Sequence, residues 1–454
     1  MKVSYTSSSL VTPAKTTWNG RMPLADWDQI GYISHVPTIH IYKPPYNYDP
    51  QQDKPFVDNL RDSLSRLLVH FYPLAGRLRW IEGGRLELDC NSMGVQFIVA
   101  GTKTKLDDLG EFLTSPEIQS LAPHIDYEIT PLKEHPLMYV QITQFQCGSI
   151  SISPAISHVV VDGRTASYFL SEWSRLARGL SLEFPPFLDK RVLRAGEQLI
   201  RPPPPDFLPF LIPPLLIGKN SDKEEREKET IVSMLKLSKN QVEILKNKAN
   251  ETRQDKYSRP YSRYETITGH IWRCASEARD HKLEQPTGLG ISVDIRRRMQ
   301  PPIPQNFLGN STIDVVASAC SGDLISRPIG YSASRVREAI DKVTNEFVHT
   351  TIDFWKNQED LTPFQDIHSS TSDEGPFYGN PNLGVTSWLT LPFQGLDFGW
   401  GEEVYMGPVT HDVDGDFILF NDNHNGDGSV IVRACLQVPH MKAFRKLFYA
   451  LIMV

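Results

Sequence analysis

Apolar residues recur along the chain at two spacings, one typical of helices and one typical of strands. In residues 56–68 they stand three or four positions apart, which predicts a helix with one buried face. Residues 76–90 alternate apolar and polar side chains on both sides of a Gly-Gly pair, which predicts a hairpin. Residues 136–157 predict two further strands joined by a turn. The first part of the chain therefore mixes hairpins and helices without a regular strand-helix alternation.

A helix is expected directly after these strands. Asp162 can cap its first turn, apolar residues share one face over 166–177, and Gly179 suits the position after its end. Before the helix stands His158–Gly163, whose three consecutive valines favour extended backbone. In a strand, residues four apart lie about 13 Å from each other. Unless the chain turns sharply between the two residues, we therefore expect Asp162 to cap the helix or pair with an arginine, and not to orient the imidazole of His158.

The later part of the chain shows the same mixture. It predicts helices at 237–250, 264–279, 332–357 and 441–451, and strands at 289–296 and over most of the C-terminal region. Hairpins together with helices favour an α/β fold of mixed-sheet domains over a barrel.

Prolines and then charged residues between about 200 and 229 form the sharpest change in composition. This change indicates a domain boundary. We expect an N-terminal domain at 1–200, a linker at 201–225 and a C-terminal domain at 226–454, with part of 375–400 a candidate to pack on the N-terminal domain.

The charge balance and the apolar stretches exclude several partners. Lys and Arg number 47 against 54 for Asp and Glu, a net charge of −7, and no basic tract is able to neutralise a run of phosphates, so we expect no nucleic acid partner. The apolar stretch Phe207–Ile217 contains prolines and falls short of the roughly 20 residues needed to span a bilayer, so no membrane partner is expected. The N-terminus shows no secretory signal pattern, which makes the cytoplasm the expected location.

Metal sites and disulfides are not indicated either. The five cysteines lie far apart and form no CxxC pair. Residues 421–428 resemble the start of a calcium-binding loop, but Val432 stands where the bidentate glutamate is required. We interpret this segment as a turn between two strands and expect no metal.

His158 is the residue best suited to chemistry. A histidine can accept and return a proton near neutral pH. A lone HxxxD pattern is common by chance, so this observation carries little weight by itself. The sequence shows no GxSxG nucleophile motif and no cysteine in a reactive context. A base without its own nucleophile fits direct attack by a bound substrate.

The motifs HVVVDG at His158–Gly163 and DFGWG at Asp397–Gly401 together resemble the plant BAHD family of acyl-CoA-dependent acyltransferases. Further matching stretches are Phe71–Leu78, Phe145–His158, Tyr264–Arg273 and Asn380–Pro392. The resemblance covers essentially the whole chain. It implies two similar mixed-sheet domains of the chloramphenicol acetyltransferase type, joined by a long crossover loop, with an active-site channel at their interface.

The resemblance also implies roles for individual residues. His158 would be the general base, removing a proton from the acceptor as it attacks the thioester, without a covalent acyl-enzyme. A basic residue, Arg296 or Arg298, would anchor Asp162, and we assign Arg298 to the structural set. The other structural residues are Asp397, Gly399, Trp400 and Gly401. Acyl-CoA would be a co-substrate, no cofactor would be permanently bound, and a monomer is expected.

The acceptor is predicted from one position at which this chain differs from the shikimate-type enzymes of the family. Shikimate-type enzymes carry an arginine in SWxRLP that takes the acceptor's carboxylate, whereas this chain has Thr390 at that place. Acidic residues stand nearby in the sequence, including Asp373, Glu374 and Asp412. Ammonium groups of a polyamine need such carboxylates. The combination is similar to spermidine hydroxycinnamoyl transferases, and O-acylation of an alcohol such as shikimate or quinate is the alternative.

Thr38 and His40 match family positions that line the substrate channel. The resemblance therefore makes both candidates for acceptor contact. The usual alternative for such a histidine is a structural role. The motifs do not identify individual CoA contacts.

Overall fold

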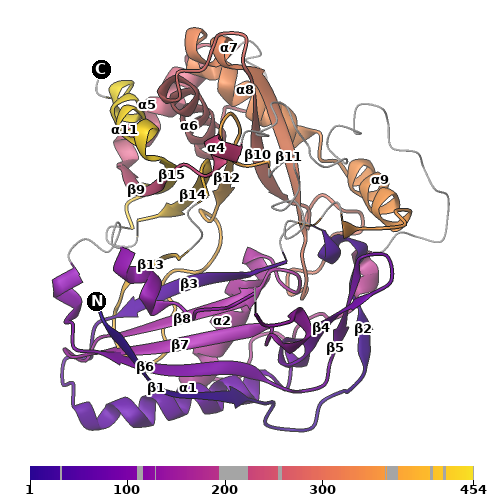
Figure 1. Ribbon diagram of the computed structural model, residues 1–454, viewed down its shortest axis with the longest axis vertical. Coiled ribbons are helices and arrows are strands. Elements are labelled where there is room, and N and C mark those ends of the chain that lie inside the picture. Colours follow the sequence, from indigo (N-terminus) through magenta and orange to yellow (C-terminus); the bar gives the residue numbers. More distant parts are fainter. Residues whose placement is uncertain are drawn as a thin grey trace.

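The computed structural model shows two halves stacked on each other, the N-terminal half below and the C-terminal half above in Figure 1. It describes residues 1–30, 33–109, 116–127, 129–193, 223–253, 258–362, 365, 377–409, 413–422 and 426–452. The predicted linker lies outside the described residues up to position 222. Within the described ranges, no helix is long and apolar enough to cross a membrane.

The N-terminal half is built on a six-stranded mixed sheet of order β1-β6-β7-β8-β3-β13, in which β6 and β7 run parallel. Its strands are β1 Val3–Val11, β3 His35–Tyr42, β6 Val95–Thr102, β7 Met138–Phe145, β8 Ile150–Ser157 and β13 Glu403–Pro408. Helices α1 (Asp53–Leu67) and α2 (Gly163–Ala177) supply apolar residues to its largest core. A small sheet of β2 (Arg21–Pro23), β5 (Arg85–Asp89) and β4 (Arg77–Ile81) stands beside it.

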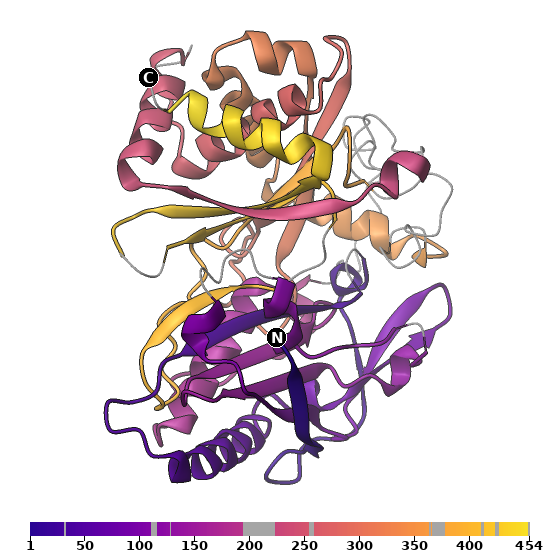
Figure 2. The ribbon, with the colours of Figure 1, turned by 60° about the vertical axis from the view of Figure 1, so that its left-hand side comes forward.

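The C-terminal half repeats this plan with a sheet of order β11-β10-β12-β14-β15-β9. Its strands are β9 Thr230–Leu237, β10 Pro286–Asp294, β11 Thr312–Cys320, β12 Leu383–Ser387, β14 Asp416–Asn421 and β15 Val430–Gln437. The α-helices are α4 Lys223–Arg226, α5 Lys239–Glu251, α6 Arg263–Ala278, α7 Ser321–Ser326, α8 Ile329–Asp341, α9 Asn345–Lys356 and α11 Val438–Ala450. Figure 2 shows α11 lying across the face of this sheet that points away from the N-terminal half.

Short 3-10 helices complete the described structure. They are Asp26–Gln29, Pro50–Gln52, Tyr72–Ala75, Leu106–Leu109, Pro116–Leu121, Leu132–Glu134 and Lys190–Leu193.

The two halves share an apolar core at their contact. Ile418, Phe420 and Ile431 of the C-terminal sheet belong to the same buried cluster as the residues of α1 and α2. Residues 388–400 pack into this cluster as well, and β13 then pairs with β3 at the edge of the N-terminal sheet (Figure 1). The C-terminal half therefore contributes a strand and several large side chains to the N-terminal half.

Most predicted elements are present. The hairpin of β4 and β5 turns at Gly83 and Gly84, both with positive φ. The single helix expected at 332–357 is wrong, because the chain breaks between α8 and α9. Thr344 causes a new start there, since its side chain accepts a hydrogen bond from the backbone N–H of Phe347 as an N-cap.

Candidate active site

Residues 158–160 form a turn, and extended backbone returns at Asp162, the N-cap of α2. β8 ends at Ser157, whose carbonyl accepts a hydrogen bond from Val160 N at 3.2 Å. The side chains of Val159, Val160 and Val161 are buried in the apolar core between α1, α2 and the sheet. The expectation of extended backbone is therefore wrong at Val159 and Val160, because tertiary burial of the side chains outweighs a weak local preference.

His158 stands at the exposed point of this turn. Its neighbours from Ile152 to Asp162 are buried, while His158 itself is half-buried. Its backbone is fixed on both sides, since its N–H donates to Ser34 O at 2.9 Å and its carbonyl accepts from Asn310 Nδ2 at 2.8 Å. A fixed backbone under a partly accessible imidazole is what a base needs to meet a substrate.

Asn310 joins the two halves at this turn. Its side chain also donates to Val159 O at 3.1 Å, and its backbone N–H donates to Asp28 Oδ1 at 3.0 Å. Asp28 is in turn held by Lys190 Nζ at 2.9 Å in a buried ion pair. The sequence analysis missed these three residues, because their pairing over more than a hundred positions leaves no local signal.

Asp162 caps α2 and pairs with Arg296. Its Oδ1 accepts from Thr165 N and its Oδ2 from Ser311 N, each at 2.8 Å. Arg296 Nη2 lies 2.8 Å from Asp162 Oδ2. Burial alone would raise the pKa of Asp162, but the Arg296 guanidinium and the hydrogen bonds hold this pKa below its ordinary value. Asp162 therefore remains ionised and connects α2 to the C-terminal half.

The assignment of Arg298 as the anchoring residue is wrong. Arg298 Nη1 donates to the carbonyls of Ile340 and Val343, at the end of α8. Arg296 and Arg298 lie in the same turn after β10, and their side chains leave it toward different partners, Asp162 and the end of α8. The two arginines thus serve different contacts.

The DFGWG segment lies at the other end of α2. Asp397 Oδ2 pairs with Arg178 Nη1 at 3.2 Å, and Arg178 is the C-cap of α2. Asp162 caps the opposite end, and a 15-residue helix is about 22 Å long. The segment is therefore remote from His158.

Packing explains the residues of this motif. The indole of Trp400 is buried against Phe56 and Tyr48, and its Nε1 donates to Gly148 O at 3.2 Å. Gly399 has a φ of +86°, and a Cβ at Gly401 would lie 2.3 Å from the Lys43 carbonyl oxygen.

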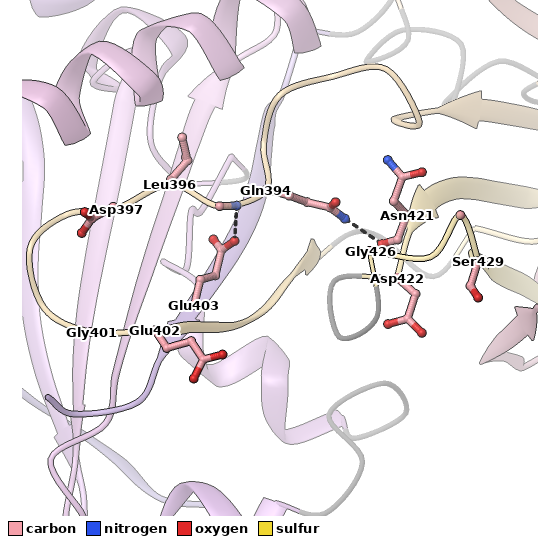
Figure 3. A pocket seen from close by; sticks show the side chains of 12 residues that line it. Gln394, Leu396, Asp397, Gly401, Glu402, Glu403, Asn421, Asp422, Gly426 and Ser429 are labelled. Carbon is pink, nitrogen blue, oxygen red and sulfur yellow. Dashed lines mark hydrogen bonds between the residues drawn. The ribbon is translucent and has the colours of Figure 1, made fainter. Parts of the chain in front are cut away.

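A cavity of about 600 Å³ lies beside this motif (Figure 3). Its lining includes Asp397, Glu402, Glu403 and Asp422. Two hydrogen bonds brace it: Gly395 N donates to Glu403 Oε2 and Gln394 Nε2 donates to Asn421 O, each at 2.6 Å. Since Asp397 belongs to the far end of α2, this cavity is not the space around His158.

His40 contacts Glu403, which lines the cavity beside the DFGWG motif. Its side chain is buried, and its Nδ1 lies 2.8 Å from Glu403 Oε1. Along β3, the residue paired with Ser157 is His35, so His40 is about 17 Å farther from the turn at His158. Thr38 is also buried on this strand. The geometry gives His40 a structural partner and does not place it at the base.

Thr390 lies closer than His40 to the turn at His158. A Cβ at Gly163 would come within 2.8 Å of Leu391 Cδ1, so Leu391 packs against the first residue of α2. Thr390, its neighbour, is exposed. Asp373, Glu374 and Asp412 lie outside the described residues.

The contact between the halves also carries polar residues, of which Ser292 and Asp314 were not predicted from the sequence, whereas Asp416 belongs to the acidic HDVDGD segment considered for acceptor binding. Ser292 of β10 and Asp314 of β11 are paired in register, and Ser292 Oγ lies 2.5 Å from Asp314 Oδ1. Burial raises the pKa of Asp314, while the Ser292 hydrogen bond and the neighbouring His158 oppose that rise. Asp416, on the same face of the sheet, pairs with Arg433 at 3.3 Å, and burial raises the pKa of Asp416 to about 6. The sequence signal for Ser292 and Asp314 is that each is a polar residue within a strand of mostly apolar residues.

Comparisons with known proteins agree with this architecture. The profile of the Transferase family matches residues 1–451. A hydroxycinnamoyl-CoA:piscidic acid hydroxycinnamoyltransferase of Actaea racemosa is 43% identical over 98% of this chain and 99% of its own. A shikimate O-hydroxycinnamoyltransferase of Nicotiana tabacum is 35% identical over 99% and 100%. A hydroxycinnamoyl-CoA:5-hydroxyanthranilate N-hydroxycinnamoyltransferase of Avena sativa is 32% identical over 99% and 100%.

Solved structures share the fold at low sequence identity. Vinorine synthase superposes with a TM-score of 0.69 at 20% identity and covers 99% of this chain and 98% of its own. TRI101 of F. graminearum in complex with ethyl coenzyme A gives a TM-score of 0.76 at 15% identity, over 94% and 96%. These two likenesses support the α/β fold with two mixed sheets.

Proposed function

This chain belongs to the Transferase family, and we propose that it transfers hydroxycinnamoyl groups from their CoA thioesters to an amine acceptor. The BAHD transferases of this family use an acyl-CoA as co-substrate and need no permanently bound cofactor. Three relatives that match nearly the full chain are named for hydroxycinnamoyl transfer, on both oxygen and nitrogen acceptors. This supports the donor, and the acceptor needs its own argument.

The observation that carries the proposal is the half-buried His158 in a turn held from both halves. The acceptor nitrogen attacks the thioester carbonyl, the C–N bond forms and the C–S bond breaks. His158 takes the proton from the attacking nitrogen and returns it to the departing CoA sulfur. Because Asp162 is ionised and engaged by Arg296, its role is to hold the turn and the helix in place.

Spermidine is the acceptor that we propose. Thr390 beside the start of α2 lacks the guanidinium suited to a carboxylate acceptor. Asp314 puts a carboxyl group on the face of the C-terminal sheet that meets the N-terminal half, and Asp416 on the same face is already paired with Arg433. A carboxylate such as Asp314 in this place favours ammonium groups over anions.

O-acylation of a hydroxy acid is the second candidate. It is favoured by the relatives named for piscidic acid and for shikimate, at 43% and 35% identity. Identity of this order is compatible with a change of acceptor, as the N-acyltransferase relative at 32% illustrates. The two candidates share the donor and the base and differ in the atom that attacks.

The deciding experiment gives the purified protein one hydroxycinnamoyl-CoA and a pool of spermidine, shikimate, quinate and 5-hydroxyanthranilate. Product masses identify the acceptor, and a thiol reagent measures released CoA. The proposal expects mono- and poly-acylated spermidine. Ester products with no spermidine amide would replace it with the second candidate, and CoA release without any conjugate would defeat both.

A further inference from the structure

Asp314 occupies a distinctive place at the contact between the halves. It lies on β11, the outer strand of the C-terminal sheet, three residues after Ser311, whose N–H holds Asp162. The preceding Asn310 holds the carbonyl of His158. The strand that carries Asp314 is therefore fixed to the turn that carries the base, so the position of the carboxylate relative to His158 is set by the fold.

The side chain reaches accessible space although protein surrounds it. Asp314 and Ser292 are both exposed, while Ile313 and Val315 on either side of Asp314 are buried. At the same time the carboxyl is desolvated enough for burial to raise its pKa. The carboxyl is therefore open to a ligand while protein groups stand around it.

One oxygen of the carboxylate is available to a ligand. Ser292 Oγ bonds to Oδ1, and Oδ2 has no hydrogen-bond partner in the described part of the chain. Among the described residues, His158 and Tyr264 interact electrostatically with Asp314. Tyr264 already donates its hydroxyl to Val385 O at 3.0 Å.

Two glycines, Gly288 and Gly290, occupy the next positions along the same face of β10. The rings of Phe377 and Tyr378 pack against these glycines. Ser292 and Asp314 thus form a polar pair between an aromatic surface and His158. A flexible acceptor placed there would put a distal charge against Asp314 while its attacking group faces the imidazole.

We propose that Asp314 selects the acceptor by charge: its carboxylate binds an ammonium group of a cationic acceptor beside His158 and disfavours anionic acceptors. The inference rests on the proposed acyl transfer at His158 and adds a residue that sets its acceptor class. Two opposite charges a few ångströms apart attract each other and two like charges repel each other, and both effects weaken where water reaches the pair. The residue acts on binding of the acceptor and not on the donor.

The test compares Asp314→Asn, which keeps the shape and removes the charge, with Asp314→Glu, which keeps the charge. Asp62→Asn on α1 is the matched control, since this carboxylate is 68% exposed and pairs only with the surface Arg66 among the described contacts. Each protein is assayed with spermidine and with shikimate at saturating hydroxycinnamoyl-CoA. Melting temperatures verify that each variant is folded.

We expect Asp314→Asn to raise KM for spermidine roughly tenfold or more with kcat less affected, since a charge contact of this kind is lost. The ratio of kcat/KM for spermidine to that for shikimate should fall by the same factor, while Asp314→Glu keeps most of it and Asp62→Asn leaves it unchanged. An unchanged ratio in Asp314→Asn overturns the inference. An equal loss for both acceptors with a displaced pH profile also overturns it, because Asp314 would then act through His158.

Failure of the proposed acceptor gives a different result. If the wild-type protein makes only the shikimate ester, spermidine is excluded as its acceptor. Asp314→Asn must then still increase kcat/KM for shikimate, because a repelling charge is removed. No increase in that case would overturn the charge-selection role as well.

Discussion

Arg296 Nη2 bridges both carboxylate oxygens of Asp162, at 2.9 Å from Oδ1 and 2.8 Å from Oδ2, and both side chains are 1% exposed. The residues are 134 positions apart and belong to different halves of the molecule. Breaking a buried ion pair from one side leaves the other charge without compensation. This pair therefore couples the integrity of the contact between the halves to the turn at His158.

Arg296→Met should lower the free energy of unfolding by about 3–5 kcal/mol, because Asp162 would remain buried without its counter-ion. Chemical denaturation measures the change. Arg297→Met is the matched control, since this neighbouring arginine is exposed. Equal stability of the two variants would show that the pair does not hold the halves together. Asp162→Asn should act in the same direction as Arg296→Met.

His158→Ala should reduce kcat by about two to four orders of magnitude, the usual contribution of a positioned base. The fold should be retained, because the imidazole is half-buried and the turn is held through its backbone atoms. Single-turnover release of CoA with the best acceptor measures the effect, and circular dichroism checks the fold. A folded variant with wild-type turnover would remove His158 from the mechanism.

Local signals predicted the start and the end of α2 correctly, and they failed at the turn before it, where distant residues decide. Asp162 as the N-cap of α2, and Gly179 with a φ of +77° just after its end, depend on neighbours within a few positions. The turn at residues 158–160 depends on burial of three valines in a core assembled from both halves. Short-range propensity contains no information about that core.

The same distinction holds for the candidate site. The motifs identified His158, but the spacing of the sequence could not choose between Arg296 and Arg298, because the choice depends on which side chain turns toward α2. The pairing of Ser292 with Asp314 follows from the register of β10 and β11, which alternation alone does not fix. Ser292 and Asp314 are 22 positions apart in the sequence and meet only because β10 and β11 pair.

Stability should also depend on pH through Glu265, which completes the capping box of α6 with Ser262 and contacts two arginines. Its Oε1 lies 2.7 Å from Arg259 Nη2 and its Oε2 lies 2.9 Å from Arg337 Nη2. Burial would raise the pKa of Glu265, but these arginines and the bonds from Ser262 lower it to about 2. A carboxyl with a depressed pKa stabilises the fold above its unfolded pKa and loses that effect as pH falls through the folded value.

Glu265→Gln should therefore destabilise the protein by about 3 kcal/mol at pH 7, and the difference from wild type should shrink between about pH 4.5 and pH 2. Denaturation at a series of pH values measures this difference. Glu243→Gln on α5 is the control, because its carboxylate is 50% exposed and pairs with Lys246 at the surface. A difference for Glu265→Gln that stays constant across the acid range would contradict the linkage.

Trp400→Ala tests whether the DFGWG motif contributes to folding stability or to the acyl-transfer reaction. The indole is 4% exposed, packs on Phe56 and Tyr48 and donates to the Gly148 carbonyl, so its removal should cost about 3–5 kcal/mol of folding free energy. Because the motif lies at the end of α2 opposite to Asp162, the folded fraction should keep kcat close to that of the wild type. Trp80→Ala, at a tryptophan that is 38% exposed, controls for the loss of an indole. Activity per folded molecule is measured at low temperature, where both variants are folded. If Trp400→Ala lowers this activity, the motif acts on the reaction and not only on the packing of the two halves.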